Sequence, residues 1–98
     1  MGDIKRFADL NPAFDDVEEW VKIDDLLDKE IMVEDFVTAE GEYGEYAIIK
    51  FTLPEDFIPR AFTTGAKVIL KKVKMAKEKD VLPLPGKIVK KKRYYDII

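Results

Sequence analysis

The chain has 98 residues and a formal net charge of −3, with 47% hydrophobic and 38% charged residues. This length accommodates one small domain, and this hydrophobic content excludes a chain that is disordered for want of apolar residues. No apolar run approaches the roughly 18 residues that a membrane-spanning helix needs, and the N-terminus lacks the apolar segment of a secretory signal. We therefore expect a cytoplasmic protein with no membrane partner.

The composition also limits the chemistry. The chain contains no Cys, His, Ser or Gln, and Asn11 is its one asparagine. Disulfides, Cys/His metal sites and catalysis by a thiol, an imidazole or a serine hydroxyl are therefore excluded. We expect neither an enzyme nor a cofactor or bound metal, and the one enzymatic alternative is a nuclease whose metal is held by carboxylates. Scarce Asn, Gln and Cys with abundant Lys and Glu is the trend of hyperthermophile proteins, which predicts a thermophilic source.

Charge is divided unevenly along the chain. Residues 1–60 hold 17 acidic and 6 basic residues, a net charge of −11, whereas residues 61–98 hold 11 basic and 3 acidic residues, a net charge of +8. Such asymmetry is a hint of contact with nucleic acid or another polyanion. The alternative is that the two halves neutralise each other in the fold.

Residues 1–21 are predicted to form an N-terminal arm with a short helix, outside a main domain of residues 22–98. Asn11 is a good N-cap, Pro12 suits the first helical position, and acidic residues follow in the first turn. Phe14, Val17 and Val21 then lie at helical spacing and give an apolar stripe, with Trp20 beside them. We expect a helix near residues 12–21 that docks on the main domain or on a partner.

The main domain reads as strands interrupted by one helix. The alternation of apolar residues shifts near Glu34-Asp35, which predicts a β-bulge in a long first strand. The expected strands are residues 30–39, 46–53, 57–62, 87–90 and 94–98, and the expected helix covers 66–79 with a buried face of Ala66, Ile69, Leu70, Val73 and Ala76. A helix between the third and fourth of five strands is the order of a mostly β, five-stranded Greek-key OB-fold barrel. The alternative is a generic α+β sheet.

Short blocks across residues 22–98 resemble small OB-fold proteins of phages and prophages that are regarded as single-stranded-DNA-binding-like. The blocks that carry the resemblance are Lys22–Ile31, Val33–Phe36, Glu42–Ala47, Phe62–Val68, Gly86–Val89 and Arg93–Tyr95. The resemblance implies an OB-fold and a phage-related role in binding DNA. The acidic loop at residues 40–45 departs from what a loop that grips DNA would need.

OB-folds hold single strands by stacking bases on aromatic rings and pairing phosphates with cations. In the second strand, a register with Ala47, Ile49 and Phe51 inward leaves Tyr46 and Lys50 outward, because burying an unpaired Lys is costly. The same reasoning turns Arg60 and Phe62 outward on the third strand. These four outward residues are candidates for contact with nucleic acid, although exposed aromatics of small barrels also serve as plain surface.

The other candidate residues form a basic and aromatic run at the tip of the last hairpin: Lys90, Lys91, Lys92, Arg93, Tyr94 and Tyr95. Alternation along a strand turns the two tyrosines to opposite faces, so one of them belongs to the core. The run is equally well explained as a solvated turn, or as lysines that protect an edge strand from aggregation.

Together these features predict a non-catalytic protein that binds single-stranded DNA with little sequence preference. The sequence does not separate DNA from RNA, because that choice depends on contacts to a 2′-hydroxyl group. The alternative is a protein-interaction or oligomerisation module in a replication or phage assembly, with the acidic N-terminal helix as its docking element and a replication protein or a second copy as its partner.

Overall fold

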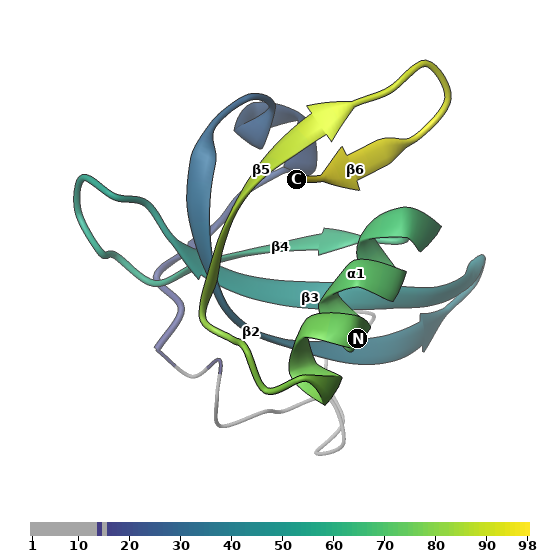
Figure 1. The fold of residues 1–98 in the computed structure, drawn as a ribbon, viewed down its shortest axis with the longest axis horizontal. Coiled ribbons are helices and arrows are strands. Elements are labelled where there is room, and N and C mark those ends of the chain that lie inside the picture. Colours follow the sequence, from purple (N-terminus) through teal and green to yellow (C-terminus); the bar gives the residue numbers. More distant parts are fainter. Residues whose placement is uncertain (1–13, 15) are drawn as a thin grey trace, which may run out of the picture.

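The computed structural model of the chain describes residue 14 and residues 16–98, so most of the predicted arm lies outside the described residues (Figure 1). The described part forms a β-rich fold with one α-helix. Its elements in chain order are β1 (Glu19–Trp20), the 3-10 helix η3 (Ile23–Leu26), β2 (Glu30–Gly41), β3 (Gly44–Thr52), β4 (Arg60–Thr64), α1 (Lys67–Glu78), β5 (Leu84–Lys90) and β6 (Tyr95–Ile97). No helix in this part of the chain is long and apolar enough to cross a membrane.

The strands lie in one sheet in the order β1-β4-β3-β2-β5-β6. All neighbours are antiparallel except β1 and β4, which are parallel. The long strand β2 pairs with β3 along most of its length and with β5 at its beginning, and the register against β3 shifts between Val33 and Asp35. The predicted bulge is confirmed, and it bends β2 so that one strand serves both halves of the sheet.

The mostly β fold is as predicted, but the closed five-stranded barrel is wrong. The sheet has six strands and is open, with β1 and β6 at its edges. The helix lies between the fourth and fifth strands in chain order, because the short strand β1 precedes the long one. Closure of the barrel would bring β6 to the outer edge of β4, and β1 already occupies that edge through the pairs of Glu19 with Arg60 and Trp20 with Ala61.

Residues 17–28 connect the two ends of the open sheet. The amide of Val21 donates to the carbonyl of Ala61 at 2.9 Å, and the amide of Asp28 donates to the carbonyl of Ile88 at 2.7 Å. Between these bonds, the side chain of Leu26 is buried in the core. This whole segment belongs to the fold, although the sequence analysis placed its first part, residues 17–21, in the arm.

The predicted helix near residues 12–21 is wrong for residues 17–20, which are not helical, whereas Phe14 has a 3-10 conformation. Glu19 and Trp20 are extended in β1, while residues 12, 13 and 15 lie outside the described part. The physical reason is the pairing with β4, because backbone hydrogen bonds to a neighbouring strand outweigh a local preference for helix. Phe14 is half-buried and accepts a hydrogen bond from the amide of Val17 at 3.2 Å.

The core is continuous between α1 and the concave face of the sheet. Four of the five predicted helix positions (Ile69, Leu70, Val73 and Ala76) are buried, and Ala66 is the half-buried N-cap. On β3, the predicted inward residues Ala47, Ile49 and Phe51 are fully buried. Alternation therefore predicted the core of these two elements correctly.

Candidate nucleic-acid interface

The outer face of β3 carries two of the predicted site residues. Tyr46 and Lys50 point away from the core and are half-buried. The ring of Tyr46 lies against Gly41, where an added Cβ atom would approach two ring carbons to 3.2 Å. Tyr46 therefore covers the β2–β3 hairpin.

Lys50 is engaged by an acidic residue. Its Nζ atom lies 2.8 Å from Oδ1 and 3.0 Å from Oδ2 of Asp16. The hydrogen bond from Lys50 lowers the pKa of Asp16 below its usual range. A phosphate would have to displace this carboxylate to reach Lys50, which makes Lys50 a poor phosphate ligand.

Arg60 is held even more completely. Its two terminal nitrogens donate to the two carboxylate oxygens of Asp56 at 2.8 and 2.9 Å, and Nε donates to Glu19 at 3.0 Å. The hydrogen bonds from Arg60 are the main cause that lowers the pKa of Asp56 to about 2. Three of its five N–H donors are thus used by two carboxylates, and its side chain is only 11% exposed. Arg60 therefore ties β1 and the β3–β4 loop to β4 and is a poor ligand for phosphate.

The outward orientation predicted for Phe62 is wrong. Phe62 is fully buried, and its ring packs edge-to-face on Phe51 with centroids 5.6 Å apart. The reason is the register between β4 and β3: Phe62 lies opposite Ile49, and paired residues of neighbouring strands point to the same face. Since Ile49 points inward, Phe62 does as well.

The basic and aromatic run at residues 90–95 lies at the tip of a hairpin, as predicted. Lys90 pairs with Tyr95, and the amide of Lys91 donates to the carbonyl of Tyr94 at 2.8 Å. Residues 90–94 are exposed. Lys92 and Arg93 form no ion pair or side-chain hydrogen bond with the residues that the structure describes.

The two tyrosines of this hairpin have different roles. Tyr94 is 46% exposed, whereas Tyr95 packs against the core and donates its hydroxyl to Asp24 of η3. That hydrogen bond is the main cause that raises the pKa of Tyr95. The Nζ atom of Lys90 lies 5.4 Å from the centre of the Tyr95 ring, within the range of a cation–π contact. Tyr94 alone of this pair is available for stacking.

A second surface with the same chemistry lies outside the predicted site residues. A groove of about 510 Å³ runs between the β2–β3 hairpin tip and α1. Tyr43 stands at its rim, 97% exposed, and Lys67 and Lys71 line its wall without ion pairs among the described residues. Lys74 is paired with Glu45 at 2.6 Å. Two features of the sequence could have indicated this surface. One is an aromatic residue in a glycine-bearing hairpin loop, and the other is a pair of lysines four positions apart on a helix.

The structure does not bring all the predicted site residues together. The tips of the β2–β3 and β5–β6 hairpins project on the same side of the molecule as the N-terminal end of α1 (Figure 1). The β3–β4 loop lies on the opposite side, and Lys50 and Arg60 are close to it in the chain. The cations of the β5–β6 tip and of the N-terminal half of α1 thus include several with no acidic partner among the described residues, whereas Lys50 and Arg60 are paired. Other unpaired lysines of the described part, such as Lys22, Lys29 and Lys79, are exposed elsewhere on the surface.

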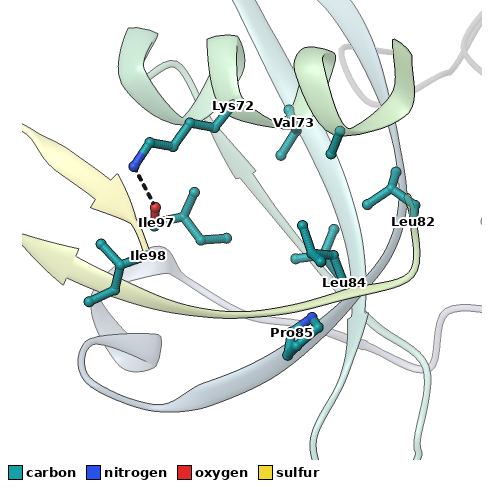
Figure 2. Close-up of a pocket in the computed structure, with 9 residues that line it drawn as sticks. Lys72, Val73, Leu82, Leu84, Pro85, Ile97 and Ile98 are labelled. Carbon is teal, nitrogen blue, oxygen red and sulfur yellow. Dashed lines mark hydrogen bonds between the residues drawn. The ribbon is translucent and has the colours of Figure 1, made fainter. Parts of the chain in front are cut away.

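An apolar pocket near the open edge of the sheet is a weaker candidate (Figure 2). It lies between α1 and the beginning of β5, and at one end of it Lys72 donates to the carbonyl of Ile97 at 2.9 Å. Its volume is about 110 Å³, whereas pockets that hold small ligands usually measure roughly 300–1,000 Å³. The pocket is a gap in packing rather than a ligand site.

One of three comparisons with known proteins gives a match, and it covers nearly all of the described chain. No curated protein and no solved structure matches it. A family model matches residues 17–98, and this range begins with the segment that connects the two ends of the sheet. The chain therefore belongs to the family described as a domain of unknown function, DUF8468.

Proposed function

We propose that the protein binds single-stranded DNA with little sequence preference, at the side of the molecule that carries the two hairpin tips and the N-terminal half of α1. The observation that supports this most strongly is the distribution of cations. Lys92, Arg93, Lys67 and Lys71 have no acidic partner among the described residues, whereas Arg60 is neutralised by carboxylates. Unpaired cations at one end of an otherwise acidic protein favour local binding of phosphates.

The exposed tyrosines supply the second element of such a site. Tyr43 and Tyr94 stand at the two hairpin tips that flank the lysines of α1. Stacking of a base on an aromatic side chain contributes about 1–3 kcal/mol and tolerates any base. Glu42 beside Tyr43 repels phosphates from that tip, so Tyr43 would contact bases while the backbone follows α1 and the β5–β6 tip.

The proposal includes an open relative of the OB-fold as the scaffold. The order of the elements supports a relationship to the OB-fold. A long bulged strand serves both halves of the sheet, and two antiparallel strands, a helix and a final hairpin follow it. In this relative, residues 17–28 bridge the gap that a barrel would close.

The experiment is fluorescence anisotropy with a labelled oligothymidylate of about 15 nucleotides at low salt. The variant Lys91→Ala/Lys92→Ala/Arg93→Ala should bind at least about tenfold more weakly than the natural chain, because it loses up to three phosphate contacts. The matched control is Lys22→Ala/Lys29→Ala/Lys79→Ala, which makes the same charge change at exposed lysines elsewhere. No binding by the natural chain, or an equal loss in both variants, contradicts the proposal. An oligouridylate arm measures whether RNA is preferred.

A role in protein interaction or oligomerisation is the second candidate, and one observation favours it. Trp20 is 61% exposed on the edge strand β1, and large exposed aromatic residues are enriched at interfaces. Because Glu19 and Trp20 are extended, a partner would add to the sheet edge and not bind a helix. Sedimentation over a range of concentrations, with Trp20→Ala as the comparison, tests this role.

A further inference from the structure

A second groove lies on the side of the β3–β4 loop, away from the hairpin tips. It has a volume of about 440 Å³ and runs between the beginning of β2 and that loop. Its walls are largely apolar and include Met32, Leu53, Phe57 and Pro85. The charged residues that line it are Glu30 and Glu34.

Phe57 is held at the rim of this groove in an unusual conformation. Its φ angle is 57°, and its side chain is 76% exposed. A positive φ is rare for a bulky residue and persists only where the surrounding structure enforces it. The surrounding loop therefore enforces the conformation that exposes the ring of Phe57.

The contacts of the loop show what enforces this conformation. The amide of Phe57 donates to the carbonyl of Leu53 at 3.2 Å, and the amide of Ile58 donates to Oδ1 of Asp56 at 3.0 Å. The side chain of Asp56 is in turn fixed by Arg60. These bonds lock the loop on both sides of Phe57 and hold its ring outward, in place for a contact.

The charge of the groove indicates the kind of partner. Neither Glu30 nor Glu34 forms an ion pair with the described residues, and Glu34 accepts one hydrogen bond, from the hydroxyl of Thr52 at 3.2 Å. No Lys or Arg is among the residues that line the groove. An apolar floor with unpaired carboxylates fits apolar side chains flanked by Lys or Arg, and it repels phosphate.

We propose that this groove is a docking site for a short, extended segment of another protein that carries apolar residues between basic ones. The side chain of Phe57 would pack on the apolar residues, and Glu30 and Glu34 would pair with the cations. The site is separate from the proposed nucleic-acid surface, because the β3–β4 loop and the hairpin tips lie on opposite sides of the molecule (Figure 1). The proposal does not depend on DNA binding.

The experiment selects phage-displayed random peptides of about 12 residues on the immobilised full chain, since peptide grooves typically engage a few anchor side chains. Selected peptides should combine Lys or Arg with apolar residues. They should bind at least about fivefold more weakly to Phe57→Ala, because this variant loses a central aromatic anchor. Binding to Tyr43→Ala, which removes an even more exposed ring elsewhere, should be unchanged. Glu30→Gln/Glu34→Gln should weaken binding of basic peptides.

Three outcomes overturn the proposal. One is that no peptides are enriched, and another is that enriched peptides bind Phe57→Ala as well as the natural chain. The third is self-association that sedimentation detects in the natural chain and that Phe57→Ala abolishes, because the occupant would then be a second copy of this chain.

Discussion

Arg60 and Asp56 form a two-point ion pair across the end of the β3–β4 loop, with both nitrogen–oxygen distances below 3 Å. The sequence analysis took Arg60 for a phosphate ligand. In the structure its guanidinium group is used within the fold, where it fixes the loop that presents Phe57 and, through Glu19, fastens β1 to β4. The same interaction thus removes Arg60 from one candidate surface and shapes another.

The Asp56–Arg60 pair predicts a specific dependence of stability on pH. The pKa of Asp56 in the folded protein is lowered to about 2 from an ordinary value of 3.8. Its contribution to stability is therefore fully present above about pH 4 and is lost as the pH falls toward about 2. Asp56→Asn should be less stable than the natural chain at neutral pH, and the difference should shrink over that acid range. Urea unfolding at several pH values measures it.

The control for this prediction is Glu55→Gln, which neutralises the neighbouring carboxylate without touching the pair. Its effect on the free energy of unfolding should be small at every pH. A difference between Asp56→Asn and the natural chain that stays constant from neutral to acid pH contradicts the role assigned to the pair.

Phe62 should behave as a core residue. Because its ring is fully buried against Phe51, Phe62→Ala should lower the free energy of unfolding by about 3–5 kcal/mol. Tyr43→Ala, at a side chain that is 97% exposed, should change it by no more than about 0.5 kcal/mol. Urea denaturation of the two variants measures both values. Similar small losses would place Phe62 on the surface, as the sequence analysis expected.

Leu26 tests whether residues 17–28 are part of the fold. Its side chain is buried between the two ends of the sheet, so Leu26→Ala should cost about 2–5 kcal/mol of stability. The same substitution at Leu84, which is 42% exposed, should cost markedly less. Thermal or urea unfolding compares the stability of the two variants. A loss at Leu26 that is as small as the loss at Leu84 would show that the connecting segment is dispensable.

The sequence was most informative where structure depends on local pattern. Alternation identified Ala47, Ile49 and Phe51 as inward residues, and helical spacing identified the buried face of α1. It failed where strands far apart in the chain meet. The orientation of Phe62 depends on the register between β4 and β3, and the strand conformation of Glu19–Trp20 depends on pairing with β4.

The candidate site was affected in the same way. A cation was taken as available from its residue type, but availability depends on which acidic residues the fold brings beside it. Lys50 meets Asp16, 34 positions away. Arg60 meets Glu19, 41 positions away, and also Asp56, four positions away. The exposed tyrosine of the last hairpin, Tyr94, became distinguishable from Tyr95 only through the contact of Tyr95 with Asp24.

The proposed position of a nucleic-acid surface can be tested by single substitutions. Lys50→Ala should change the affinity for oligothymidylate by less than about twofold, whereas Lys71→Ala should lower it by about three- to tenfold, because one phosphate contact is lost. Anisotropy at low salt measures both variants under the same conditions. The reverse order of effects would return the site to the outer face of β3.

The most direct measurement of the proposed function is the dependence of oligothymidylate affinity on salt. For single strands, the slope of log K against log salt concentration is about −0.7 for each phosphate that is neutralised. Removing the charges of Lys91, Lys92 and Arg93 together should make the slope shallower by about 2, because three phosphates would no longer release their counterions on binding. Binding whose slope is the same in the natural chain and in this triple variant would contradict the claim that the β5–β6 hairpin tip holds the phosphate backbone.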